Sequence, residues 1–237
     1  MTPSLNRIAH IESWKKTSLG TPIELFSSRP LTELRDQKPL LLIGGVHGDE
    51  PEGVRLARET LSWLKTQDEN VIVPWILIPS LNVDGLAKKT RGNARGVDLN
   101  RNYPSADWTP KFEKERYFPG PAPASEPEVQ GIVELIRDFK PRLIIHCHSW
   151  NPCIVGTGPR AQTDAKRLSE SSGYELVPEI GYPTPGSLSR YGWHDLSIPI
   201  ICIEEDDKNP DFDAIWPRFQ TGMTAVFKDR SLREEAK

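Results

Sequence analysis

Four runs of apolar residues divide the chain, and each has the length of one β-strand. They are continuously apolar rather than alternating, which is typical of strands covered on both faces of a sheet. The runs are Pro39–Gly44, Val71–Pro79, Arg142–Cys147 and Ile198–Ile203. Two earlier segments, 8–14 and 23–27, alternate more strongly between apolar and polar residues and predict a hairpin at an edge of the sheet.

Helical patterns lie between and after these runs. Four segments carry apolar residues at helical spacing: Glu50–Lys65, Val129–Phe139, Thr163–Ser172 and Phe212–Phe227. Ser125 and Glu128 have the spacing of a capping box, which predicts the start of the second helix. Pro217 is expected to break or kink the last one.

The alternation of strands and helices predicts the fold class. We expect a single α/β domain over residues 1–237, with a mostly parallel or mixed twisted sheet and helices on both faces. No internal repeat, low-complexity tract or linker divides the chain, and a length of 237 residues suits one large domain. The charged tail, residues 229–237, is expected to fray.

The composition of the chain excludes several classes of protein. Hydrophobic residues make up 37% of the chain, enough for one sizeable core, and the formal net charge of −3 argues against a nucleic-acid-coating protein. No apolar stretch is long enough to span a membrane, and the N-terminal residues lack the pattern of a secretory leader. The cysteines are odd in number, without CxxC spacing, which favours free thiols and a cytoplasmic location.

The first candidate chemistry follows the first apolar run, in the sequence GGVHGDE. Glycines at 44, 45 and 48 permit a tight turn, so His47 and Glu50 can point at one spot. A close pair of ligands with a distant third is a common way to hold catalytic zinc. The alternative is a glycine-rich turn with a capping carboxylate and a solvent-facing histidine.

A second histidine pair ends the third apolar run. Strand alternation puts His146 and His148 on one side and Cys147 on the other. His148 is nearer the carboxyl end of the strand, over the crevice where open α/β sheets bind ligands. His146 lies one strand repeat deeper, which suits a packed or hydrogen-bonded group behind a ligand.

Two further groups carry charge. Glu204 directly follows the last apolar run, so its carboxylate starts from a partly desolvated position and could serve as a general base, whereas Glu205 should point the other way. A plain solvated strand exit is the alternative. Residues 91–104 gather three arginines with amides and acids, suited to carboxylate binding or oxyanion stabilisation, or else a basic surface loop. Their glycine spacing matches no nucleotide-binding fingerprint.

Five short motifs follow one another along the chain. They are HGDE at 47–50, NVDG at 82–85, RGN with GVDLNRNYP at 91–104, HS at 148–149 and the strand-end Glu204. In this order they resemble the zinc carboxypeptidase family, the M14-like metallopeptidases. GGVHGDEPEG and GYPTPGS are similar, more specifically, to its murein peptide amidase branch. The similarity covers about residues 40–205.

The resemblance implies a zinc site and a general base. His47, Glu50 and His148 match the family's three ligands, which hold one Zn²⁺ per chain, and Glu204 matches its general base. His146 occupies a position that is not a ligand in the family.

The resemblance also implies residues that act on the substrate. Arg91 matches the arginine that polarises the scissile carbonyl, and Asn100 and Arg101 match the pair that binds the substrate's terminal carboxylate. The family's substrate-capping tyrosine has no secure counterpart: Tyr191 is one candidate, but Trp193 falls as near by spacing.

Together these matches imply zinc-dependent hydrolysis of an amide bond near a substrate C-terminus. The most specific expectation is cleavage of the γ-D-glutamyl–meso-diaminopimelate bond of the murein tripeptide, in cell-wall peptide recycling. A general metallocarboxypeptidase and an aspartoacylase-type zinc acyl-amide hydrolase are the alternatives, and a non-catalytic binder of cell-wall peptides suits the matched positions least. The proline-rich segments after Tyr103 and around residues 181–186 are expected to form the rim of the substrate cleft.

Overall fold

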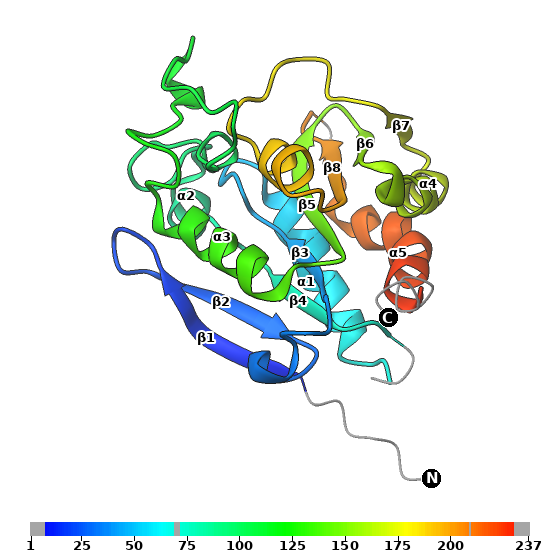
Figure 1. Cartoon of the computed structure of the whole chain (residues 1–237). Helices are drawn as coiled ribbons and strands as arrows, with labels where there is room; N and C mark the ends of the chain where they lie inside the picture. Colours follow the sequence, from blue (N-terminus) through cyan, green and yellow to red (C-terminus); the bar gives the residue numbers. More distant parts are fainter. Residues whose placement is uncertain (1–7, 69–71, 209, 230–237) are drawn as a thin grey trace.

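The four apolar runs lie side by side at the centre of one mixed, eight-stranded sheet (Figure 1). The computed structural model describes residues 8–68, 72–208 and 210–229. The strands are β1 (Ala9–Lys16), β2 (Pro22–Ser27), β3 (Leu40–Ile43), β4 (Trp75–Ile78), β5 (Leu143–Trp150), β6 (Cys153–Thr157), β7 (Glu175–Val177) and β8 (Ile200–Asp206). The predicted start of the second run at Val71 falls outside the described residues.

The strand order is β1-β2-β4-β3-β5-β8-β6-β7. The central strands β4, β3, β5 and β8 are parallel, as their continuous apolar sequences predicted. The hairpin β1–β2 joins antiparallel at one edge, and β6 pairs antiparallel with β8 near the other. The α/β fold with a mixed sheet is therefore confirmed.

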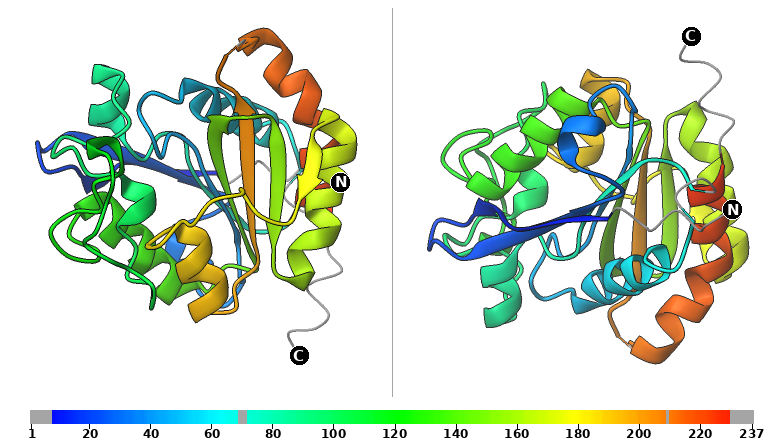
Figure 2. Two further views of the ribbon diagram at one scale, coloured as in Figure 1. Left: turned by 90° about the horizontal axis from the view of Figure 1, so that it is seen from above. Right: turned by 90° about the horizontal axis from the view of Figure 1, so that it is seen from below.

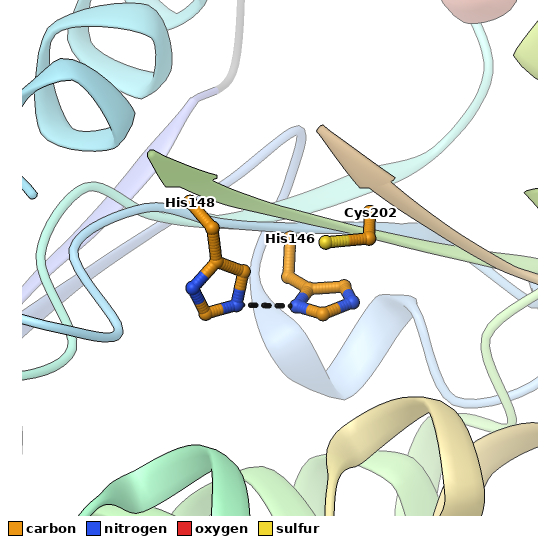
Figure 3. A group of neighbouring side chains, drawn as sticks. All are labelled: His146, His148 and Cys202. Carbon is orange, nitrogen blue, oxygen red and sulfur yellow. Dashed lines mark hydrogen bonds between the residues drawn. The ribbon is translucent and has the colours of Figure 1, made fainter. Parts of the chain in front are cut away.

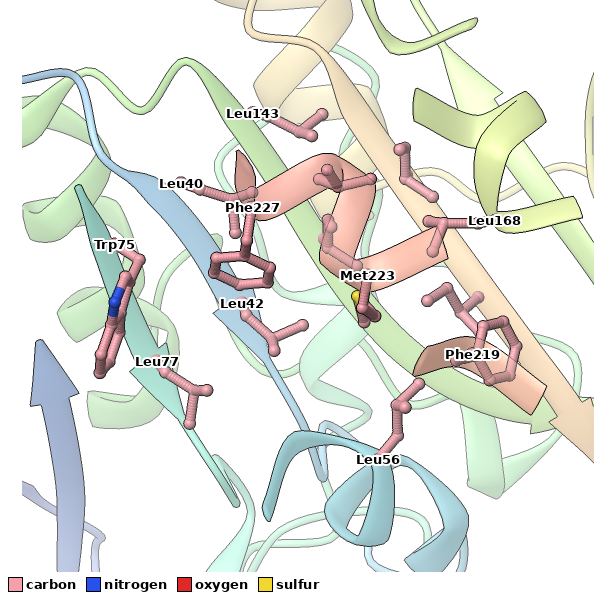
Figure 4. Close-up of a cluster of buried hydrophobic side chains, with 14 of the residues drawn as sticks. Leu40, Leu42, Leu56, Trp75, Leu77, Leu143, Leu168, Phe219, Met223 and Phe227 are labelled. Atoms are coloured by element: carbon pink, nitrogen blue, oxygen red, sulfur yellow. The ribbon is translucent and has the colours of Figure 1, made fainter. Parts of the chain in front are cut away.

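Helices cover both faces of the sheet (Figure 2). On one face α1 (Pro51–Leu64), α4 (Pro159–Ser172) and α5 (Phe212–Lys228) enclose a core that includes Leu42, Phe219 and Phe227 (Figure 4). On the other face α3 (Pro127–Phe139) packs its apolar residues over the opposite sides of β3 and β4. Neighbouring residues of one central strand thus belong to different cores, which explains the continuous apolar runs.

The start of α3 differs from the prediction. Its N-cap is Glu126 rather than Ser125, and no side chain caps the helix. Asn93 Nδ2 instead lies 3.3 Å from both carboxylate oxygens of Glu128, and the Ser125 hydroxyl donates to Glu126. The capping-box prediction was wrong because a distant loop bonds Glu128.

The last helix is not broken at Pro217, since α5 continues through it. A proline removes the hydrogen bond to the carbonyl four residues earlier, here that of Asp213. Asp213 is exposed, so water can satisfy that carbonyl. The predicted frayed tail lies outside the described residues, apart from Asp229. Within the described residues, no helix combines the length and apolarity that crossing a bilayer requires.

Several short elements escaped prediction. They are α2 (Val83–Lys88), η1 (Leu31–Glu33), η2 (Leu99–Arg101), η3 (Glu115–Tyr117), η4 (Arg190–Asp195), β6 and β7. The strands β5 and β8 also run further than their apolar cores, because they stay paired as far as Trp150 and Asp206. His148 and Glu204 therefore lie within paired strands, opposite each other in register.

Candidate active site

A cleft of about 1340 Å³ opens over the carboxyl ends of β3, β5 and β8. This is the place where the chain connections leave the parallel strands in opposite directions, the usual binding position in open α/β sheets. Both proline-rich segments line the cleft, through residues 107–119 and 178–185.

The turn after β3 brings the first two candidate ligands to the floor of this cleft. Gly48 packs directly on the backbone of α2, where an added Cβ would lie 1.9 Å from the carbonyl carbon of Gly85. Asn82 caps α2 by accepting a hydrogen bond from the Gly85 amide at 2.9 Å. The close approach of α2 therefore holds the turn that carries His47 and Glu50.

Three donor groups from β5 and this turn converge. His47 Nδ1 lies 2.9 Å from Glu50 Oε1, and His148 Nδ1 lies 3.0 Å from both Glu50 Oε2 and His47 Nδ1. All three side chains are buried. Ligand atoms about 2.0–2.2 Å from a tetrahedral zinc are separated by roughly 3.3–3.6 Å. The observed separations of 2.9–3.0 Å come within a few tenths of an ångström of the lower end of this range, so the donor set fits zinc.

Charge is concentrated in this group. Burial alone lowers the pKa of His47, but the carboxylates of Glu50 and Asp98 outweigh it and raise the pKa to about 9. Burial alone raises the pKa of Glu50, and the two imidazoles outweigh it, so the pKa lies well below its usual range. A cation in this position would replace the proton that these groups share in its absence.

Asp98 organises the site from behind, although sequence reasoning gave it no role. Its carboxylate is fully buried and accepts hydrogen bonds from His47 Nε2, Arg91 Nε and the Asn100 amide, each at 2.9 Å. The bond to Nε2 leaves Nδ1 of His47 turned toward Glu50. A carboxylate behind a ligating histidine is a common arrangement in metal sites. In the sequence, the position of Asp98 within the GVDLNRN motif could have indicated a role in the site.

Glu204 and Glu205 point to opposite faces of β8, as predicted. Glu204 lines the cleft and Glu205 bonds to Tyr174 and Arg218 on the other side. Burial, together with the nearby Glu50 carboxylate, raises the pKa of Glu204 to about 8. The Cys202 thiol lies 3.3 Å from Glu204 Oε1.

The arginines predicted to act on the substrate also line the cleft. Arg91 bonds to Glu50 through Nη1 and to Asp98 through Nε, both at 2.9 Å. Arg101 is 9% exposed, and no carboxylate within the described parts of the chain forms an ion pair with it. Asn100 Oδ1 accepts a bond from the Leu188 amide, so its amide nitrogen is the end turned toward His148.

Of the two aromatic candidates named from the sequence, Tyr191 does not line the cleft. Tyr191 stacks on the buried Tyr103, with ring centroids 6.2 Å apart, and packs against the core. Tyr182, which sequence reasoning missed, is 43% exposed in the cleft, with its ring 6.0 Å from the Arg101 guanidinium. In the sequence, the position of Tyr182 within GYPTPGS, a segment predicted to form the rim of the substrate cleft, could have indicated a role. Trp193 lies in the cleft wall, against Gly158.

His146 and Cys202 form a second group with His148 beside the first (Figure 3). His146 is 1% exposed and its Nδ1 lies 2.8 Å from His148 Nε2. Burial and the neighbouring imidazoles hold the pKa of His146 well below its usual range, so its ring is neutral. Cys147, by contrast, packs in the core on the other face, and all three cysteines are free thiols.

Two imidazoles and a carboxylate that could hold a metal, with a further carboxylate beside them, form the kind of site that metal-dependent hydrolases use. The family model for zinc carboxypeptidase matches residues 4–193, and the chain belongs to this family. It is accordingly a hydrolase with zinc as its cofactor, as the motifs predicted.

Similar proteins agree with this membership. Murein peptide amidase A of Escherichia coli K12 is 30% identical over 205 residues, covering 81% of this chain and 80% of the relative. Murein peptide amidase A of Vibrio campbellii is 27% identical, covering 81% and 77%. The crystal structure of murein-tripeptide amidase MpaA from Escherichia coli O157 superposes with a TM-score of 0.74 at 27% identity, covering 94% of this chain and 92% of that one.

Proposed function

We propose that this protein is a zinc-dependent amidase that releases meso-diaminopimelate from the murein tripeptide by cleaving its γ-D-glutamyl amide bond. The reaction type is supported by one observation above all. Three donor side chains converge in a cleft that also holds Glu204 and the buried Arg101, which has no carboxylate partner among the described residues. The substrate is supported by the murein peptide amidases, which the chain matches over most of their length.

In this proposal His47, Glu50 and His148 hold the zinc. When bound, zinc supplies Lewis-acid polarisation of the scissile carbonyl and a lowered pKa for attacking water. Asp98 fixes the tautomer of His47 by accepting the hydrogen on Nε2. The Ser149 amide, 3.2 Å from Glu50 Oε2, orients the carboxylate.

Glu204 transfers a proton from the attacking water to the leaving amine. Its Oε1 faces the Cys202 thiol, so we assign the transfer to Oε2. This oxygen accepts a proton from the attacking water and then delivers it to the nitrogen of the leaving amine. A pKa raised by burial suits both halves of this task at neutral pH.

The remaining residues bind the substrate. Arg91 uses two of its nitrogens within the site, which leaves Nη2 to stabilise the negative charge that develops on the carbonyl oxygen. Arg101 and the amide nitrogen of Asn100 bind the carboxylate next to the cleaved bond. Tyr182 covers the bound substrate from the rim of the cleft.

The test is hydrolysis of L-Ala-γ-D-Glu-meso-diaminopimelate by the purified protein, with and without a chelator. We expect release of diaminopimelate that stops with the chelator and returns with zinc. A panel of peptides with ordinary C-terminal residues runs in parallel. Release of amino acids from that panel alone would replace the amidase with a general metallocarboxypeptidase, the second function that the family allows.

We also propose that the reaction belongs to cell-wall peptide recycling in the cytoplasm. Three buried free thiols suit a reducing compartment, where disulfides do not form. Detection of the native protein in the cytoplasmic fraction of cells supports this location, and detection outside that fraction contradicts it.

A further inference from the structure

His146 takes no part in the proposed reaction, although it is buried beside a proposed ligand. Its two ring nitrogens both face a partner: Nδ1 lies 2.8 Å from His148 Nε2, and Nε2 lies 3.4 Å from Ser189 Oγ. Figure 3 shows the two rings from β5 joined by the first of these bonds. A neutral imidazole donates a hydrogen bond through one nitrogen and accepts one through the other. The partners of His146 therefore restrict where the protons of both rings can lie.

The two nitrogens of His148 face different surroundings. Nδ1 faces the proposed metal position, 3.0 Å from both His47 Nδ1 and Glu50 Oε2. Nε2 faces two groups, His146 Nδ1 at 2.8 Å and Asn100 Nδ2 at 3.4 Å. The amide of Asn100 cannot turn over without losing the bond from the Leu188 amide to its oxygen. Asn100 can therefore only donate toward His148.

The choice of tautomer decides whether His148 can bind a metal. A neutral imidazole has one protonated and one unprotonated nitrogen. With the proton on Nδ1, the ring donates to Glu50 and accepts from Asn100, and no lone pair faces the metal position. With the proton on Nε2, the Nδ1 lone pair is available, but Nε2–H needs an acceptor. Among the groups around Nε2 that the structure describes, only His146 Nδ1 can accept it.

We propose that His146 is a positioning residue that accepts the Nε2 hydrogen of His148 and so holds the Nδ1 lone pair toward the metal. The inference rests on the proposed role of His148 as a ligand. The proton of His146 then lies on Nε2, with Ser189 Oγ as its acceptor. Asn100 Nδ2 has no bond to His148 in this state and is left to donate to the substrate carboxylate.

The Cys202 thiol raises an alternative, in which His146, His148 and Cys202 hold a second metal ion. The donor atoms of His146, His148 and Cys202 lie within 4.8 Å of one another, as those of a second metal site would. Such a site would require metal on both nitrogens of His148. The Cys202 thiol donates to Glu204 Oε1 at 3.3 Å and would have to lose that hydrogen to bind a metal, which favours the positioning role.

Two variants of the protein distinguish the effect of the hydrogen bond from that of the imidazole ring. In His146→Asn the amide oxygen replaces Nδ1 as acceptor, whereas His146→Leu removes the acceptor at similar volume. The zinc affinity of each is measured by competition with a chromophoric chelator. We expect His146→Leu to weaken zinc binding about 10–100-fold and His146→Asn to remain within a few-fold of wild type. Ser189→Ala, one bond further away, should have a smaller effect than His146→Leu.

A direct readout of the tautomer accompanies the affinities. In ¹⁵N-histidine NMR of the zinc-loaded wild type, His148 should carry its proton on Nε2 and bind zinc through Nδ1. This measurement decides the inference even where His146→Leu fails to fold.

Wild-type zinc affinity in a folded His146→Leu variant would overturn the inference, as would zinc on Nε2 of His148. Two zinc ions per wild-type chain, with one lost in Cys202→Ala, would replace it by the second metal site. A wild type that binds no zinc would instead overturn the ligand assignment of the proposed function.

Discussion

Glu204 and Glu205 are adjacent in β8, yet their surroundings give the two carboxylates different chemistry. Glu204 faces the cleft without a cationic partner within hydrogen-bonding distance in the described chain, while Arg218 and Tyr174 hold Glu205 on the far face. Their order in the strand alone decides which one can reach a substrate, because strand side chains alternate between faces.

This contrast predicts the effect of removing each charge. Glu204→Gln should bind zinc as wild type does and lose about 10²–10⁴-fold in kcat, because general acid–base catalysis contributes about that factor. Steady-state kinetics and zinc content of the same preparation check it. Glu205→Gln is the matched control, expected to lower stability and to leave kcat close to wild type. Near wild-type turnover in zinc-loaded Glu204→Gln would remove the general-base role.

Arg101 gives a second prediction at this scale. Its buried guanidinium has no carboxylate partner among the described residues, so a substrate carboxylate would fill that place. A hydrogen bond to a charged group is worth about 1.5–3 kcal/mol. Arg101→Gln should therefore lower kcat/KM on the order of 10–100-fold for a substrate with a free carboxylate. The same substrate with that carboxylate amidated is the control: wild type and variant should hydrolyse it equally poorly.

The candidate metal ligands could be predicted from the sequence, but the residues that orient them could not. His47, Glu50 and His148 stand in short motifs, at strand ends that a parallel sheet brings together. Asp98 reaches His47 from 51 residues away, and nothing in its spacing indicates which ring nitrogen it contacts. Tyr182 lies in a loop whose path depends on packing against distant segments, so spacing along the chain suggested Tyr191 and Trp193 and did not suggest Tyr182.

At the scale of elements, the contact between the ligand-bearing turn and α2 controls the geometry of the site. Gly48→Ala would put a Cβ against the backbone of Gly85, which cannot move aside as a side chain can. Overpacking of this kind costs about 1–3 kcal/mol. We expect lower stability together with weaker zinc binding, measured by denaturant unfolding and chelator competition. Gly173→Ala, with open space around its Cβ position, should affect stability alone.

The start of α3 has its own pH dependence. Glu126 and Glu128 are fully buried beside Asn93, and burial, with the charge of Glu126, raises the pKa of Glu128 to about 7. The folded state therefore keeps a proton that the unfolded state loses near pH 4.5. This contribution to stability is complete below the unfolded pKa and is lost as the pH rises through about 7.

Glu128→Gln should remove this loss of stability at high pH. We expect the stability of the variant relative to wild type to rise between pH 5 and pH 8, in urea unfolding with chelator present. Glu134→Gln, on the exposed face of the same helix, is the control and should show no such trend. Parallel stability profiles of Glu128→Gln and wild type would contradict the assigned pKa shift.

Elements were predictable where their own residues determine them. The central strands and the helices α1 and α3 have apolar patterns that match their burial. The N-cap of α3, the strand β6 and the short helix α2 depend on partners distant in sequence. Glu128 bonds to Asn93, and β6 pairs with β8 over a register that no local pattern specifies.

For the whole molecule, the order of strands joins the site to the fold. The turn after β3 and the end of β5 lie about 100 residues apart in the sequence, and the parallel pairing of these two strands brings their donors to one point. A metal held by His47, Glu50 and His148 would therefore bind the folded state and not the unfolded chain. Its binding free energy is then added to the stability of the fold.

Zinc should consequently raise the thermal stability of the protein. Free zinc at 100 times its Kd adds about 2.7 kcal/mol, which corresponds to roughly 5–10 °C in Tm for a domain of this size. Calorimetry of chelator-treated protein, with zinc added back stepwise, measures the shift. Magnesium is the control, because it prefers oxygen ligands and should leave Tm unchanged. Equal Tm values in zinc and magnesium would mean that the three donors do not hold zinc together, whatever their separation in the folded chain.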